Sequence, residues 1–299
     1  MGCSQNMATK GRKRIGGKSP VLYFILPALI LVGVVLVYPI LYAIGISFFN
    51  WPLVDEASRG FIGISNYVSI FQDAEFWNSL FLQMGFIFIA IPIELIIGFF
   101  VAILLNREFK GVGLIRSLLL LPIFVLPVLS GLTWRLMLQP GYGAISFLLT
   151  TLGFPETALL ANPGTAYAAV IIQDIWRMWP FMFMFIYSGL INIPNSLIEA
   201  ANLDGARFWD KVIKIIIPLL RPTITTALLL RLIDALRIFS EVFVMTGGGP
   251  GNSTTLLSLY IHKQAFRYFN IGYASAMGVV LIIISLIIAN FLVRRNMEY

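Results

Sequence analysis

The sequence predicts an all-α integral membrane protein with six membrane-spanning helices. Three observations predict this fold class. Hydrophobic residues make up 59% of the 299-residue chain and charged residues only 12%, about half of the roughly 25% that is typical of a soluble domain. The mean hydropathy is +0.88. Finally, six separate apolar segments are each long enough to cross a bilayer, which requires about 20 residues of helix.

The six expected helices cover nearly the whole chain and define its domain organisation. We expect residues 1–20 to form a basic cytoplasmic tail and residues 21–299 to form one membrane domain. The first apolar segment is too long for the core of a signal peptide and no small-residue cleavage site follows it, so we expect it to remain as a helix. The six segments are residues 21–49, 79–105, 114–138, 166–190, 223–245 and 272–293.

Lysine and arginine are unevenly distributed between the connecting segments, and this predicts the orientation. Cytoplasmic loops carry an excess of these two residues. The tail, every second loop and the C-terminus are rich in them, whereas the alternate loops hold few. We therefore expect a multi-pass protein of the bacterial inner membrane with both termini in the cytoplasm. The basic positions are Lys10, Arg12, Lys13, Arg14, Lys18, Arg107, Lys110, Arg116, Arg207, Lys211, Lys214, Arg221, Arg294 and Arg295.

Several kinds of chemistry are excluded by what the sequence lacks. Cys3 and His262 are the only cysteine and the only histidine, so a disulfide framework and a site with several Cys or His ligands are excluded. Residues 11–19 resemble a phosphate-binding loop, but the first glycine is out of register and no strand precedes it. We therefore expect no catalysis, no metal and no cofactor on this chain. The net charge of +7 is explained by the cytoplasmic loops and does not indicate nucleic acid.

Residues 191–222, between the fourth and fifth apolar segments, predict a short helix-turn-helix at the cytoplasmic surface. Pro194 begins the first helix, and Gly205 provides a turn because glycine accepts a left-handed conformation. We expect a second short helix from Ala206 to Ile217, and we expect Pro218 to mark the return into the membrane. An interfacial helix would explain the basic and aromatic residues of this loop.

The small residues of this loop indicate contact with a partner protein. They stand immediately before the turn, where small side chains permit close approach. The loop resembles the "EAA" loop of permease subunits of binding-protein-dependent ABC importers. This resemblance implies the type I ABC importer permease fold and a coupling helix that docks in a cleft of the ATPase subunit. The matching residues are Glu199, Ala200, Ala201, Asp204, Gly205, Ala206 and Pro218.

A second stretch resembles the carbohydrate-uptake branch of the same class. Residues 239–250 read FSEVFVMTGGGP, and residues 252–256 and 272–276 continue the match. The resemblance is to permeases of the maltose, lactose and glycerol-3-phosphate type. It implies half of a translocation pathway for a sugar or sugar-like solute. It also implies a heterodimer with a second, similar permease, a dimer of ATPase subunits that hold ATP and Mg, and an extracytoplasmic solute-binding protein.

Three alternatives follow from the same residues. A secondary transporter driven by an ion gradient would suit the charges inside the apolar segments, but it leaves the coupling-type loop unexplained and no inverted repeat is evident. A membrane-embedded enzyme would need paired catalytic residues, and no such motif is present. A glycerol-3-phosphate or polyol importer of the same class stays open, because Arg177, Arg231 or Arg237 could contact a phosphate.

Ionisable and aromatic side chains inside the apolar segments are candidates for the translocation pathway, since charges in a membrane are costly and usually functional. At helical spacing, the four charged residues of the fifth segment share one face, which predicts either lining of the pathway or ion pairs at i,i+3 and i,i+4. The aromatic residues predict either stacking on sugars or packing. Glu94 in the second segment is open to the same interpretations. The candidates are Asp174, Trp176, Arg177, Trp179, Tyr187, Arg231, Asp234, Arg237 and Glu241.

Overall fold

The computed structural model describes residues 20–155 and 158–297, so the predicted basic tail lies outside the described residues. Strands β1 (Phe49–Asn50) and β2 (Gly60–Phe61) form one antiparallel pair. The α-helices are α1 (Pro20–Val32), α2 (Tyr38–Ile46), α3 (Ser65–Gln72), α4 (Ala74–Leu105), α5 (Val112–Leu119), α6 (Pro127–Met137), α7 (Ala144–Thr151), α8 (Pro163–Leu190), α9 (Asn195–Leu203), α10 (Phe208–Lys211), α11 (Ile217–Leu236), α12 (Ser240–Met245), α13 (Leu257–Phe266) and α14 (Ile271–Met297).

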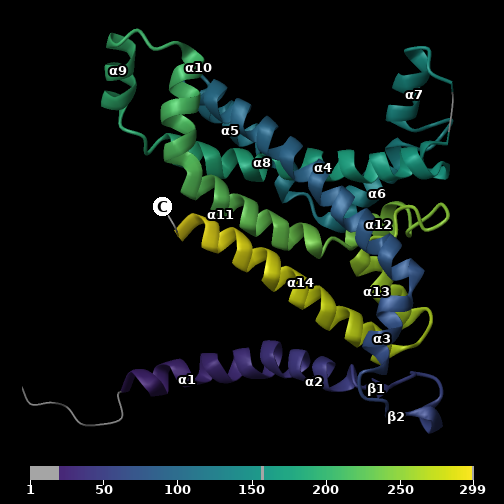
Figure 1. Cartoon of the computed structure of the whole chain (residues 1–299). Coiled ribbons are helices and arrows are strands. Elements are labelled where there is room, and N and C mark those ends of the chain that lie inside the picture. Colours follow the sequence, from purple (N-terminus) through teal and green to yellow (C-terminus); the bar gives the residue numbers. More distant parts are fainter. Residues whose placement is uncertain (1–19, 156–157, 298–299) are drawn as a thin grey trace, which may run out of the picture.

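The elements are arranged between two ends of an elongated bundle. Figure 1 shows α9, the start of α1 and the end of α14 at one end. Strands β1 and β2, α7 and the turn between α12 and α13 lie at the other end. The loop predicted to contact a partner is therefore at the same end as both limits of the described chain.

Five helices in the described residues are long and apolar enough to cross a membrane, and they confirm most of the predicted segments. They are Ile25–Ile46, Ala74–Leu105, Pro163–Leu190, Phe208–Leu236 and Ile271–Phe291. The first of them joins α1 and α2 through a π-turn at Gly33–Val37. It ends a few residues before the predicted limit, since the chain enters β1 at Phe49.

The third predicted segment, residues 114–138, is not a single straight helix. The helical stretches Val112–Phe124 and Pro127–Met137 meet at an angle of 92°. Leu126 between them has an extended backbone with ψ near 137°. The residue before a proline avoids the helical conformation, so Pro127 ends the first stretch and begins the second.

The fifth predicted segment, residues 223–245, was placed wrongly at both ends. Helix begins at Phe208 and continues without interruption through α10, a π-turn at Val212–Ile216 and α11. Pro218 therefore does not separate a surface helix from a membrane helix. A π-turn is wider than an α-turn, which accommodates the proline ring just after it. The helix then ends at Leu236, and Phe239 with φ of −142° separates it from α12.

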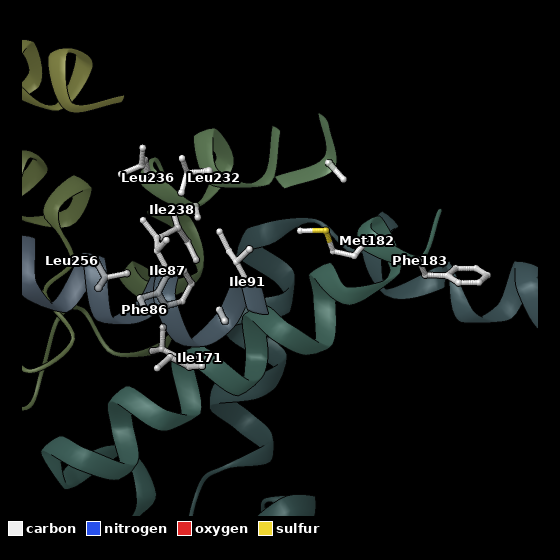
Figure 2. Close-up of a cluster of buried hydrophobic side chains, with 14 of the residues drawn as sticks. Phe86, Ile87, Ile91, Ile171, Met182, Phe183, Leu232, Leu236, Ile238 and Leu256 are labelled. Atoms are coloured by element: carbon white, nitrogen blue, oxygen red, sulfur yellow. The ribbon is translucent and has the colours of Figure 1, made fainter. Parts of the chain in front are cut away.

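The core is formed where α4, α8 and α11 pack together. Figure 2 shows Phe86 and Ile91 of α4, Ile171 of α8 and Leu236 of α11 among its side chains. Close approach of α4 to α8 depends on Gly98, where an added Cβ would lie 2.7 Å from the backbone nitrogen of Phe183. Small residues allow such approach between membrane helices, which associate mainly through van der Waals packing.

The first membrane helix stands apart from this core. Only 6% of its most apolar window is buried, and Figure 1 shows α1 and α2 running beside the bundle rather than within it. Its packed end is the one near β1, where Asn66 of α3 donates hydrogen bonds to the carbonyls of Ser47 and Phe49. The remainder presents apolar side chains to its surroundings.

Asp73 fastens three helices at the end that holds β1 and β2. One carboxylate oxygen accepts from the backbone N–H of Glu75 and Phe76 and so caps α4. The other accepts from the hydroxyls of Tyr260 on α13 and Tyr273 on α14, each at 2.6 Å. Burial raises the pKa of Asp73, but the hydrogen bonds from the two tyrosines and the two backbone groups outweigh it and leave the pKa below its usual value.

Replacing Asp73 with Asn should lower the melting temperature of the detergent-solubilised protein at pH 7. A carboxyl with a depressed native pKa contributes stability above its unfolded pKa of about 3.9 and loses that contribution as the pH falls through the native pKa. The difference in melting temperature between native protein and variant should therefore shrink below about pH 4. Asp55→Asn, at an exposed position between β1 and β2, is the control. An equal difference at pH 7 and pH 3 would contradict this account.

Candidate functional site

Six ionisable side chains meet inside the bundle and form what we call the charge cluster. They come from four helices: Glu94 on α4, Asp174 and Arg177 on α8, Arg231 and Asp234 on α11, and Glu241 on α12. The side chains of Glu94, Asp174 and Arg231 have no exposed surface. Because charges within membrane-spanning segments are costly unless paired, their pairing determines how these helices can lie.

Arg231 is the centre of the charge cluster. Its guanidinium donates two hydrogen bonds to Glu94, at 2.8 and 2.9 Å. It also donates to Asp174 and, at 3.3 Å, to Asp234. A planar guanidinium with five N–H groups suits such multiple contacts better than lysine would. The predicted i,i+3 pair of Arg231 with Asp234 is thus confirmed, and Arg231 ties α11 to both α4 and α8.

Arg177 pairs with Glu241, which the sequence predicts to pair with Arg237. Its guanidinium lies 2.8 Å from Glu241 and 3.8 Å from Asp174. Asp174 and Arg177 are three residues apart on α8, so this contact is an i,i+3 pair. The predicted pair of Arg237 with Glu241 is wrong, as is a common helical face for Glu241 and the α11 charges, because the chain breaks between α11 and α12. The backbone of Glu241 lies against α6, where a Cβ on Gly131 would be 2.8 Å from its carbonyl oxygen.

Two buried glutamines hold the helices around the charge cluster. Gln83 of α4 donates to the carbonyl of Ala235 on α11 at 2.9 Å, and Gln173 of α8 donates to the hydroxyl of Ser130 on α6 at 2.8 Å. The bent α5–α6 pair is therefore part of the same polar interior. Its 92° bend lets α6 reach α8 and α12.

Asp234 and Arg237 form the exposed edge of the charge cluster. The side chain of Asp234 is 51% exposed, and Arg237 is also exposed at the end of α11. Asp234 lies in the last turn of the apolar helix Phe208–Leu236, where a charge that faces lipid is costly. A carboxylate and a guanidinium at such an edge are able to hydrogen-bond a hydroxylated solute.

The candidate aromatic residues do not gather at one place. Trp176 packs against Trp134 of α6, with 6.0 Å between ring centroids, and Trp179 packs against Phe183. Tyr187 lies far from the charge cluster, since thirteen residues of α8 separate it from Asp174 and span about 20 Å. Trp176 and Trp179 are close to Asp174 and Arg177 in the sequence of α8, whereas Tyr187 lies at the α9 end of the molecule.

Tyr187 lines a polar cavity of about 380 Å³ at the base of α9. The guanidinium of Arg116 lies 4.5 Å above its ring and donates to the carbonyl of Leu105 at 2.6 Å. Cations are favourable at a helix C-terminus, so Arg116 fixes the end of α4 next to the end of α8. Asn106, Glu108 and Asn195 also line this cavity.

The α9 turn has the geometry that the sequence predicts. Gly205 has φ of +74°, and the N–H of Ala206 donates to the carbonyl of Ala201 at 2.9 Å. This is the hydrogen bond of a glycine-terminated helix end. Lys211 of α10 donates to the side chain of Asn202 at 2.6 Å and so fixes α9 against α10. Glu199 and Ala200 are exposed on α9, whereas Ala201 is buried.

Leu203 is a surface residue that sequence reasoning did not single out. It is 90% exposed at the end of α9, beside the turn at Gly205. Single exposed leucines are common, but this one stands on a short helix that projects from the bundle in Figure 1. The available signal was the apolar residue between Ala201 and Asp204 in an otherwise polar turn.

The described residues form a helical membrane bundle with a polar interior and a projecting short helix, which is the arrangement that a transport permease requires. Residues 18–297 match the family described as binding-protein-dependent transport system inner membrane component, and the chain belongs to this family. It is therefore a multi-pass permease subunit of an ATP-driven importer, which works with a solute-binding protein and a separate ATPase. This agrees with the expected fold class and disfavours an ion-driven transporter.

Individual relatives agree with this assignment. The chain is 38% identical over 248 residues to the trehalose/maltose transport system permease protein MalF of Thermococcus litoralis, which covers 83% of this chain and 82% of that protein. It is 36% identical over 273 residues to the sulfoquinovosyl glycerol transport system permease protein SmoG of Agrobacterium fabrum, covering 91% and 88%.

A solved structure shares the fold. A bacterial ABC transporter involved in the import of the acidic polysaccharide alginate superposes with a TM-score of 0.81 at 21% identity, covering 93% of this chain and 95% of that one. At this identity the likeness concerns the fold alone.

Replacing Arg231 with Met should destabilise the protein by about 3–5 kcal/mol, because it leaves Glu94 and Asp174 as buried carboxylates without their guanidinium. The free energy of unfolding is measured by chemical denaturation in detergent. Adding Glu94→Gln to Arg231→Met should recover part of the loss, since the double variant buries one charge fewer. A single variant as stable as the native protein would show that the pairing does not hold the helices together.

Proposed function

We propose that this permease carries a sugar or sugar-like solute and that its α9 loop is the contact through which a partner ATPase drives transport. The exposed α9 with Leu203 at its end carries the proposal. In this proposal ATP and Mg are bound by a dimer of ATPase subunits, and a solute-binding protein delivers the solute on the opposite side. The names of the relatives support the class of solute.

Three features of the loop support its role as a coupling helix. Glu199, Ala200 and Leu203 are exposed, so a partner reaches them directly. Gly205 and the hydrogen bond from Lys211 hold α9 at a fixed angle to the α10–α11 helix. A push on α9 is therefore transmitted to a membrane helix rather than absorbed by a flexible linker.

A second, homologous permease is proposed as the other half of the pathway. The α1–α2 helix has apolar surface that the rest of the described chain leaves uncovered, and Asp234 and Arg237 are exposed at the end of α11. A second subunit would account for both features. It would cover the apolar surface of α1–α2, and it would share a water-filled space beside Asp234 and Arg237. In this arrangement the charge cluster borders the pathway, with Trp176 and Trp179 nearby.

The orientation is proposed from the loops. The α9 end carries Arg207, Lys211 and Lys214, and the positive-inside rule assigns it to the cytoplasm. Both termini would then be cytoplasmic, and the β1–β2 pair and the glycine-rich turn after α12 would face the solute-binding protein. Alternating access follows: ATP closes the two ATPase subunits, α9 moves, and the membrane helices open outward.

Leu203→Asp and Gly205→Val should each reduce ATP-dependent uptake by at least tenfold in proteoliposomes that contain the whole importer. The first places a charge on the proposed contact. The second forces a β-branched residue into a left-handed backbone, which such residues avoid. Co-purification of the ATPase should fall in parallel, while the amount of permease in the membrane should stay the same.

Val54→Asp is the matched control, because Val54 is 75% exposed at the opposite end of the molecule. It should leave co-purification of the ATPase unchanged, because it lies away from the proposed ATPase contact. Normal uptake in both α9 variants would mean that the loop is a passive connector and that the ATPase engages another surface.

A further inference from the structure

The charge cluster contains more acid than base. Two guanidinium groups, Arg177 and Arg231, face four carboxylates, Glu94, Asp174, Asp234 and Glu241. When all six are ionised, the formal charge is two positive minus four negative, or −2.

Both arginines of the charge cluster are already occupied. Arg231 is fully buried and is divided among three carboxylates. Arg177 has 10% of its side chain exposed and pairs with Glu241 at 2.8 Å and with Asp174 at 3.8 Å. The Nε of Arg177 has no hydrogen-bond partner among the described residues, but an anion that displaced a carboxylate from either arginine would leave that carboxylate buried and unpaired.

Arg237 does not reverse the balance. It is exposed at the end of α11, and its Nε donates to the carbonyl of Ile233. Counting it with the charge cluster gives three positive and four negative groups, a formal charge of −1. Asp234, one turn earlier on the same helix, is the carboxylate that lies at the exposed edge.

Family membership leaves the charge of the solute open. The similar proteins include one named for trehalose and maltose and one involved in the import of an acidic polysaccharide. The sequence also left a phosphorylated solute open, on the ground that Arg177, Arg231 or Arg237 could contact it. The structure removes the first two from that role, because their charge is used within the cluster.

We propose that the permease selects an uncharged, hydroxyl-rich solute and rejects phosphorylated, sulfonated and uronic acid counterparts. This inference rests on the proposed function and on the edge at Asp234 bordering the pathway. A carboxylate accepts hydrogen bonds from solute hydroxyls, whereas it repels an anion. Asp234 is therefore a specificity-determining residue.

The test uses proteoliposomes that contain the whole importer with its solute-binding protein. Uptake is measured for three matched pairs: maltose and maltobionate, trehalose and trehalose 6-phosphate, and glycerol and glycerol 3-phosphate. The expected result is ATP-dependent uptake of an uncharged member, with its anionic counterpart at least tenfold slower. Equal or faster uptake of an anionic member would overturn the inference while leaving the proposed function intact. ATP-dependent uptake of none of the six would overturn both.

The variant Asp234→Asn distinguishes discrimination by the permease from discrimination by the binding protein, because the binding protein is the same in the native and variant preparations. Removing one negative charge should raise the rate for the anionic member relative to its uncharged partner at least threefold. Glu108→Gln removes a carboxylate at an exposed site between α4 and α5, outside the charge cluster and away from the proposed binding-protein face, and should leave that ratio unchanged. An unchanged ratio in Asp234→Asn would overturn the assignment, since discrimination would then lie elsewhere.

Discussion

The arrangement of the membrane helices depends on how one buried guanidinium is neutralised. Arg231 has no exposed surface, and its partners come from α4, α8 and α11. None of these helices can move away without leaving a charge unpaired at low dielectric. The apolar core around Phe86, Ile171 and Leu236 fills space but does not select one register. The directional contacts of Arg231 do, because a guanidinium requires defined positions for its acceptors.

The same contacts explain why the interior is both rigid and polar. A second pair, Arg177 with Glu241, brings α12 back against α8 after the break in the chain. Because of this break, the glycine-rich turn after α12 lies at the far end of the molecule, and the carboxylate of Glu241 lies inside the helix bundle. The buried members of the cluster therefore hold the helices together, and the proposed lining of a pathway would fall to the exposed members at its edge.

The sequence reveals what is local and misses what is distant. The left-handed backbone at Gly205 and the spans around α4, α8 and α14 follow from residue type and from runs of apolar residues. The end of α11 at Leu236 does not, since no glycine or proline marks it. The carbonyls at this end accept hydrogen bonds from Gln83 on α4 and Ser258 on α13, which are distant in the sequence. The prediction at Pro218 was wrong for a local reason. Proline usually ends a helix, but a π-turn just before Pro218 keeps this helix continuous. The partners of Glu94 were likewise invisible, because they lie on helices far along the chain.

The unbroken helix from Phe208 to Leu236 has a mechanical consequence. At about 1.5 Å per residue, its 29 residues make a rod of roughly 44 Å with α9 attached at one end and Arg231 near the other. Such a rod acts as a lever, so a small tilt at the α9 end becomes a displacement of Arg231 relative to Glu94 and Asp174. The π-turn at Val212–Ile216 lies between α9 and Arg231 on this rod, so any movement that α9 passes to the charges inside goes through it.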